Sequence, residues 1–310
     1  MLGFKKHKIG KLRKFTFLKW RLYAYQKPPS EKELQDAMLQ ESLHKAFWRS
    51  PQREVAAERT DAIVTLTSFG ERVDSVYLTI ESIFQQSVKP KKVLLWLDEA
   101  EFDAASLPSS LYRAQDRGLD IRFCKNTRSY KKIIPALKVF RNDILVTIDD
   151  DIMYPSSFLE NLLESHKQQP AVVMCYRAHL MCLESASKLR PYAQWQSCVS
   201  NRAASWMLFP TGAGGVLYPP QCFDDEVLNE GVFLSLCATA DDVWLKAMSL
   251  KNGVKTALVS GDCSWSILPP YIKGTQQNCL ADVNIKEGND LQLARVFDHY
   301  NLWGSLIEDD

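Results

Sequence analysis

Short apolar runs alternate with longer amphipathic segments over the first half of the chain. Three runs rich in Val, Ile and Leu are typical of buried parallel strands: residues 62–67, 92–97 and 143–148. Residues 120–124 predict a further strand between the last two of these runs. Three segments between them carry apolar side chains at helical spacing: residues 73–86, 107–117 and 130–140. The alternation predicts an α/β fold, with a mostly parallel sheet flanked by helices.

Different patterns stand before and after this region. Residues 31–48 have the spacing of an amphipathic helix, and residues 241–250 predict one more helix. After about residue 190 the regular alternation is lost. We expect residues 1–60 to form a basic helical arm with a helical extension, and residues 61–310 to form one α/β domain, with a regular half at 61–155 and an irregular half at 156–310.

Charge is distributed unevenly along the 310 residues. The total net charge is +1, but residues 1–27 hold nine Lys or Arg and no acidic residue, which leaves a net charge of −8 on the remainder. An acidic body argues against nucleic acid as a partner. The arm also holds Phe, Leu, Trp and Tyr side chains, seven of them between residues 15 and 25, so it is suited to lie on an anionic membrane surface. The alternative is a solvated or self-packed basic helix.

The eight cysteines show neither a CxxC pair nor a Cys/His metal spacing. Several lie in apolar stretches, which is typical of reduced thiols in a protein core. The arm contains no apolar segment long enough to span a bilayer and no secretion signal. These features predict a cytoplasmic protein, with a peripheral position on the inner face of the membrane if the arm binds lipid.

The strongest chemical signal is an apolar strand that runs directly into Asp149, Asp150 and Asp151. Side chains alternate along a strand, so Asp149 and Asp151 are predicted to point the same way. Three adjacent like charges repel, and a hard divalent cation with oxygen ligands would remove the conflict. Open α/β sheets bind ligands beyond the carboxyl ends of their strands, where this triplet is expected. The alternative is an acidic turn in which an Asp caps the helix after Pro155.

Basic residues near the predicted strand ends are candidates for phosphate contacts. Lys131 and Lys132 begin the segment before the triplet, where a lysine can meet a phosphate at the start of a helix. Arg72 is a similar candidate. For each of the three, the alternative is a solvated side chain.

The order of these segments resembles the nucleotide-sugar-dependent glycosyltransferases of the GT-A fold, in particular the family 2-like bacterial type. Their signature is an apolar strand, Asp-x-Asp and then a helix. Val64–Phe69 looks like the first strand and nucleotide loop of the family. Thr79–Pro90 resembles its S-hydrophobic-x-x-Q-(S/T)-x-x-P segment, and Leu94–Asp98 resembles its second strand. The resemblance covers about residues 61–260 and implies a Rossmann-like GT-A domain, with a nucleotide-binding half and an acceptor half.

The resemblance also implies roles for individual residues. Mn²⁺ or Mg²⁺ would be held by Asp149 and Asp151, and Asp98 would form a hydrogen bond with the nucleobase of the donor. The sequence departs from the family at Asp98-Glu99-Ala100, where a second Asp and a Gly are common, so the resemblance does not define which nucleobase is bound. The residues that would contact the donor nucleotide are Thr67, Ser68, Arg72, Asp98, Lys131, Lys132, Asp149 and Asp150.

An acidic pair, Asp241 and Asp242, begins the last clear helix. Thr239-x-x-Asp242 fits a capping box, which is a purely structural interpretation. In the resembled family, an acidic pair at this place supplies the base that removes the proton of the acceptor hydroxyl. If Asp242 caps the helix, Asp241 is free to act as that base.

A glycine-rich segment, Thr211–Gly215, stands between the triplet and the acidic pair. Glycine permits close approach of a backbone to a ligand, so Gly214 and Gly215 are expected to line the donor sugar. The alternative is a β-bulge or a turn.

The sequence therefore predicts a metal-dependent, inverting glycosyltransferase. It would move a sugar from a nucleotide-sugar donor, expected to be a UDP- or GDP-sugar, to a hydroxyl of a glycan or lipid-linked acceptor. The resemblance suggests assembly of surface polysaccharide or lipopolysaccharide. One alternative is a catalytically inactive scaffold of the same fold that docks on membranes. The other is a Mg²⁺-dependent Asp phosphatase or phosphotransferase, but such enzymes carry their motif on the first strand.

Overall fold

A computed structural model describes most of the chain beyond the N-terminal arm. The described residues are 5–9, 12–17, 20–21, 25–26, 29–50, 59–200, 203–276 and 288–306.

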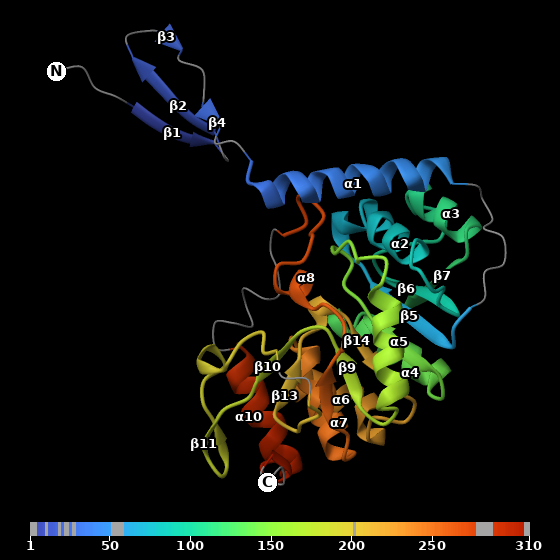
Figure 1. The fold of residues 1–310 in the computed structure, drawn as a ribbon, viewed down its shortest axis with the longest axis vertical. Helices are drawn as coiled ribbons and strands as arrows, with labels where there is room; N and C mark the ends of the chain where they lie inside the picture. Colours follow the sequence, from blue (N-terminus) through green and yellow to red (C-terminus); the bar gives the residue numbers. More distant parts are fainter. Residues whose placement is uncertain are drawn as a thin grey trace.

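A seven-stranded sheet forms the centre of the body, in the order β15-β9-β14-β8-β5-β6-β7 (Figure 1). Only β14 runs antiparallel to its neighbours in this sheet, and every other pair is parallel. The carboxyl ends of the six parallel strands therefore share one edge. The strands are β5 (Ala62–Thr67), β6 (Lys92–Asp98), β7 (Leu119–Cys124), β8 (Ile144–Thr147), β9 (Val173–Cys175), β14 (Val216–Tyr218) and β15 (Thr256–Leu258).

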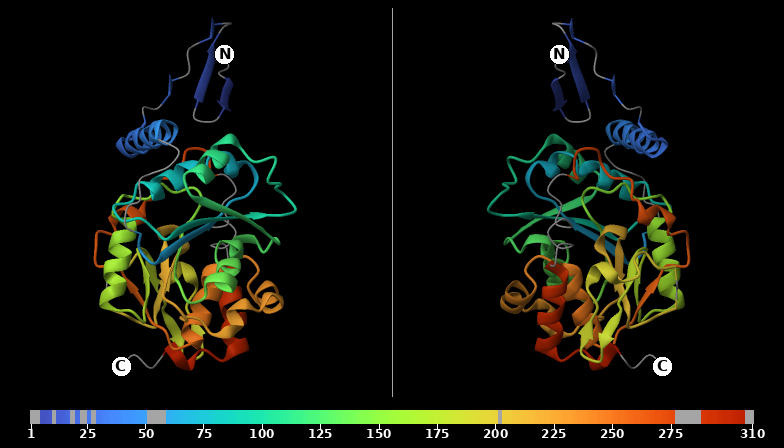
Figure 2. Two further views of the ribbon diagram at one scale, coloured as in Figure 1. Left: turned by 90° about the vertical axis from the view of Figure 1, so that its right-hand side faces the viewer. Right: turned by 90° about the vertical axis from the view of Figure 1, so that its left-hand side faces the viewer.

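Helices cover both faces of this sheet, as Figure 2 shows, which confirms the predicted α/β class. The two faces bury separate apolar cores because side chains alternate along each strand. Val64 and Leu95 face the core that holds α2, α3 and α5, whereas Ile63 and Leu94 face the core that holds α4, α6, α7 and α10. The helices are α2 (Tyr77–Phe84), α3 (Ser109–Asp116), α4 (Ile134–Phe140), α5 (Phe158–Gln168), α6 (Glu230–Leu236), α7 (Asp241–Lys251), α8 (Ser264–Ile267) and α10 (Asn289–Tyr300).

The helix predicted before the domain is present as α1 (Glu31–Arg49). A capping box between Ser30 and Glu33 fixes its first turn. Its inward side buries Leu43 and Phe47, and the Phe47 ring lies 4.8 Å from the ring of Tyr77 on α2. This contact attaches α1 to the helical layer above the sheet (Figure 1).

The arm differs from the predicted helix. Its described part forms antiparallel strands: β1 (Lys5–Ile9), β2 (Leu12–Phe17), β3 (Trp20–Arg21) and β4 (Tyr25–Gln26). Aromatic residues and threonine favour strands, and the helical interpretation gave that propensity too little weight.

Short hairpins and single-turn helices fill the irregular half of the chain. Strand β10 (Ala178–Leu180) pairs with β13 (Leu208–Pro210), and β11 (Leu183–Ser185) pairs with β12 (Lys188–Leu189). Among the described residues, no helix is both long and apolar enough to span a membrane. The seven described cysteines are unpaired, as predicted, and Cys279 lies outside the described residues.

Candidate active site

The aspartate triplet lies beyond β8, at the edge where the parallel strands end. Strand β8 ends at Thr147, so the alternation of side chains along a strand does not extend to the triplet. The backbone N–H of Asp149 donates to the Tyr154 hydroxyl at 3.0 Å, which folds the loop back on itself. As a result, the side chains of Asp149 and Asp151 have different partners.

Asp150 and Asp151 are held by polar groups from three segments. Ser68 Oγ donates to Asp150 at 2.6 Å, and Arg72 lies 2.9 Å from Asp150 and 3.2 Å from Asp151. Gln276 Nε2 donates to the other side of the cluster, at 2.6 Å from Asp151 Oδ2. Ser68 and Arg72, which the sequence proposed as nucleotide contacts, thus bind carboxylates of the protein itself.

Lys132 connects the two acidic clusters. Its amine lies 3.4 Å from Asp149 Oδ1 and 2.9 Å from Asp241 Oδ2. Burial disfavours the charged amine, but the carboxylates of Asp241, Asp149 and Asp242 outweigh it and hold the pKa of Lys132 well above its usual value. Lys132 is therefore a permanent cation between the triplet and the start of α7.

The acidic pair turns toward the same region. Gly212 donates its backbone N–H to Asp242 Oδ2 at 3.0 Å. The predicted capping box is not formed, because Ala240 is the N-cap of α7 without a side-chain cap and Thr239 hydrogen bonds with Gln292. Asp242 is thus not committed to the helix end, and the reason given for preferring Asp241 as the base is lost.

The two members of the pair differ in surroundings. Asp241 is only 7% exposed and is paired with Lys132, whereas Asp242 keeps a partly exposed side chain. Burial and the neighbouring Asp241 raise the pKa of Asp242 to about 7, against the opposing effects of Lys132 and the Gly212 N–H. In the triplet, burial and the charges of Asp149 and Asp150 likewise raise the pKa of Asp151 to about 7.

The remaining predicted donor residues line neighbouring strand ends. Thr67 donates to the Trp96 carbonyl at 2.8 Å, and Asp98 accepts from the Ala100 N–H at 3.0 Å, so both side chains also support local backbone. Lys131 is 3% exposed, and its amine has neither a hydrogen bond nor an ion pair in the described part of the chain. A buried cation without an anion at this edge is suited to a phosphate.

The glycine segment contributes through a residue that sequence reasoning missed. A Cβ on Gly212 would lie 2.9 Å from Lys132 Nζ and 3.1 Å from Asp242 Oδ1. Gly214 instead packs against Arg177, and Gly215, at a φ of 81°, packs against the Phe158 ring. The Gly-rich composition was a visible signal, but only the fold shows which glycine faces the acidic residues.

The described residues include no group of three or more His, Cys, Asp or Glu that could hold a metal ion. The triplet nevertheless offers the oxygen donors that Mg²⁺ and Mn²⁺ prefer, and Asp149 keeps a side chain that is 31% exposed. Mg²⁺ is commonly held by one or two carboxylates together with substrate phosphates. Asp149 and Asp151 thus supply oxygen donors of the type that a cation bound together with a diphosphate would use.

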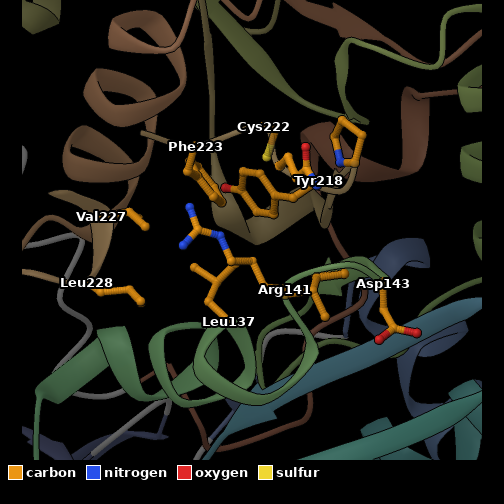
Figure 3. Close-up of a pocket in the computed structure, with 11 residues that line it drawn as sticks. Leu137, Arg141, Asp143, Tyr218, Cys222, Phe223, Val227 and Leu228 are labelled. Carbon is orange, nitrogen blue, oxygen red and sulfur yellow. The ribbon is translucent and has the colours of Figure 1, made fainter. Parts of the chain in front are cut away.

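A separate pocket lies at the opposite edge of the sheet. Figure 3 shows Leu137, Arg141, Tyr218 and Phe223 around it, near the first residues of β8. Its volume is about 10 Å³, room for about one water molecule. It is too small for a nucleotide, and its lining includes no residue of the aspartate triplet or of the acidic pair.

No protein-family model and no curated protein matches the chain. Among solved structures, mannosyltransferase PcManGT from Pyrobaculum calidifontis, in complex with GDP-Man and Mn²⁺, is 14% identical over 88% of this chain and 78% of that chain, with a TM-score of 0.47. S. aureus TarS 1-349 is 11% identical over 66% of this chain and 59% of that chain, with a TM-score of 0.44. CMP:2-keto-3-deoxy-manno-octonic acid synthetase, complexed with CTP, is 10% identical over 65% of this chain and 89% of that chain, with a TM-score of 0.38. These likenesses are distant, so the functional argument rests on the site of this chain.

Proposed function

We propose that the protein is a glycosyltransferase that moves a sugar from a nucleotide-sugar donor to an acceptor hydroxyl, with Mn²⁺ or Mg²⁺ as cofactor. The observation that carries the proposal is the bridge of Lys132 between Asp149 and Asp241, beside the Gly212–Asp242 hydrogen bond. The bridge joins the triplet after β8, which is suited to bind a cation and a diphosphate, to the acidic pair at the start of α7, which is suited to accept a proton.

In the proposed reaction, the oxygen of the acceptor hydroxyl forms a bond with C1 of the donor sugar. The bond between C1 and the phosphate oxygen breaks, and the nucleoside diphosphate leaves. Asp242 takes the hydroxyl proton, since it is partly exposed and its pKa of about 7 is close to working pH. Displacement in a single step inverts the configuration at C1.

Other residues hold the groups in place. Lys132 pairs with Asp241 and fixes it beside Asp242, and the Gly212 N–H orients the Asp242 carboxylate. A divalent cation bound at Asp149 and Asp151 would neutralise charge on the leaving diphosphate. Lys131 would add a point charge for a phosphate, and Asp98 and Thr67 would line the base and ribose at the ends of β6 and β5.

The nucleotide would occupy the half of the edge formed by β5, β6 and β7, and the acceptor would approach from the side of α7. A glycan or a lipid-linked glycan in surface polysaccharide assembly remains our preferred acceptor class. The arm would bring the enzyme to an anionic membrane that carries such an acceptor.

Thermal-shift measurements with UDP-, GDP-, CMP- and dTDP-sugars, each with Mn²⁺, test this function. We expect one nucleotide family to raise the melting temperature, and EDTA to remove the effect. The stabilising sugar nucleotide should then be hydrolysed slowly to free sugar and nucleoside diphosphate. Stabilisation without any turnover would favour an inactive scaffold of the same fold. No response to any of the four families would contradict the proposal.

A further inference from the structure

Arg177 lies at the same edge of the sheet as the triplet but on its other side. It follows β9, which is separated from β8 by β14 in the strand order. Two strand spacings amount to about 10 Å. The proposed nucleotide residues follow β5 and β6, on the opposite side of β8. Arg177 therefore belongs to the half of the edge where the acceptor would bind.

The glycine turn connects Arg177 to the proposed base. Thr211 donates its backbone N–H to the Arg177 carbonyl at 3.0 Å, and the next residue, Gly212, donates to Asp242 at 3.0 Å. Gly214 permits a close approach, since a Cβ there would lie 2.9 Å from Arg177 Cβ. One turn thus fixes the position of the Arg177 backbone relative to Asp242.

The charge of Arg177 has no partner in the described structure. Its guanidinium makes neither a hydrogen bond nor an ion pair there, and its Nε is buried without an acceptor. Arg72 and Lys132, by contrast, each contact two carboxylates. Because a half-buried cation without an anion is unfavourable, Arg177 is suited to bind an anion from outside the chain.

His179 and Tyr192, two titratable side chains that interact with the charge of Arg177, do not supply that anion. Burial and the charge of Arg177 lower the pKa of His179 to about 4, so His179 is neutral at working pH. Burial and Asp242 raise the pKa of Tyr192 above its usual value, against the effect of Arg177, so Tyr192 keeps its proton. Neither His179 nor Tyr192 therefore compensates the charge of Arg177.

We propose that Arg177 binds an anionic group of the acceptor, a carboxylate or a phosphate, and so selects an acidic acceptor. The planar guanidinium can donate two parallel hydrogen bonds to either group. The proposal rests on the proposed glycosyltransferase function and makes that function more specific. Arg177 would be a specificity-determining residue, whereas the proton transfer belongs to Asp242.

The test compares acceptors that differ by one anionic group. With the donor that stabilises the protein, transfer is measured to methyl glucoside and methyl glucuronide, and to glycerol and glycerol 3-phosphate. We expect at least one acidic member to have a KM about tenfold to a hundredfold below that of its neutral partner, the range for a charged hydrogen bond. The two pairs distinguish a carboxylate from a phosphate.

Substitutions then assign the preference to Arg177. Arg177→Gln should remove it by raising the KM of the acidic acceptor, with donor hydrolysis and neutral acceptors unchanged, and Arg177→Lys should keep part of it. Arg295→Gln, on the exposed side of α10, is the matched control and should keep the full preference. The wild-type comparison needs no variant, so a misfolded Arg177→Gln leaves the test intact.

Equal use of both members of each pair by the wild type would overturn the proposal and leave the glycosyltransferase function standing. Loss of acidic and neutral transfer alike in folded Arg177→Gln would also overturn it. Absence of any donor turnover would contradict the glycosyltransferase function and this proposal together.

Discussion

The two acidic clusters of the site compensate their negative charge in different ways. Asp150 and Asp151 of the triplet share Arg72, with further hydrogen bonds from Ser68 and Gln276. The pair at the start of α7 depends on one buried lysine for Asp241 and on a backbone N–H for Asp242. The triplet thus shares one arginine side chain between two carboxylates, whereas Asp242 of the pair accepts from a backbone N–H.

This difference indicates different chemistry. A divalent cation would compete with Arg72 for the carboxylates of Asp150 and Asp151, so the triplet is suited to exchange one cation for another. A backbone N–H is not exchanged in that way, so Asp242 keeps its position while its proton comes and goes. Lys132 is shared by both clusters, and its bridge makes the two halves one site.

The largest expected effect is the loss of transfer activity when the triplet can no longer bind a metal ion, a role that the pair does not have. Asp151→Asn should nearly abolish transfer because it removes a charged ligand for the cation, while the fold stays intact with one repulsive charge fewer. EDTA should abolish transfer in the wild type, and added Mn²⁺ should restore it. Asp116→Asn, an exposed residue on α3, is the control and should remain active. Full activity in EDTA would remove the metal from the mechanism.

The next effect tests the division of roles within the pair. Asp242→Asn should lower kcat by about 10²–10⁴-fold, the usual contribution of a general base, with donor affinity near normal. Asp241→Asn should act indirectly, by leaving Lys132 without its nearest carboxylate. Steady-state kinetics together with donor titration distinguish the two. If Asp241→Asn is inactive and Asp242→Asn turns over normally, the roles are reversed.

A smaller effect is expected at the glycine turn. Gly212→Ala would place a methyl group 2.9 Å from Lys132 Nζ and 3.1 Å from Asp242 Oδ1. The lysine end can move, but Asp242 loses its orientation, so kcat should fall by about tenfold, the cost of about 1.4 kcal/mol in the transition state. Gly231→Ala, where a Cβ meets nothing closer than 3.8 Å, is the control. Unchanged kcat in Gly212→Ala would separate this turn from catalysis.

The pH dependence of protein stability tests the surroundings of Asp242 in the acidic pair. The pKa of Asp242 is about 7 in the folded protein, above the value of about 3.9 in an unfolded chain. Between these two values the folded state binds more protons, so stability should decrease as pH rises from about 4 to 7. In thermal unfolding without metal, the melting temperature of Asp242→Asn should fall less than that of the wild type between pH 4 and pH 7. Identical curves would indicate that Asp242 titrates normally.

The smallest expected effect on turnover concerns the arm. Deleting residues 1–27 removes nine basic side chains, so binding to phosphatidylserine liposomes should weaken, most clearly at low salt. Transfer to a soluble acceptor should be unchanged, since the arm contributes no residue to the described site. Liposome co-sedimentation measures the first effect. Equal binding by both forms would exclude a membrane role for the arm.

Much of the fold could be predicted because its signals are local. The runs at 62–67 and 92–97 have the length and apolar content of buried strands, and both are strands of the sheet. The triplet was visible because three aspartates after an apolar run have no role in packing. The arm was misjudged because basic and aromatic residues are compatible with more than one conformation.

What the sequence determined is therefore the set of elements and the chemical type of the site. The tertiary structure alone decided the partners: that Lys132 joins Asp149 to Asp241, that Gly212 rather than Gly214 faces the acidic residues, and that Asp242 binds a backbone N–H instead of capping α7. The physical reason is distance along the chain. A propensity is a property of neighbouring residues. Lys132 and Asp241 stand 109 positions apart in the sequence, and only the packing of the sheet and its helices brings them together.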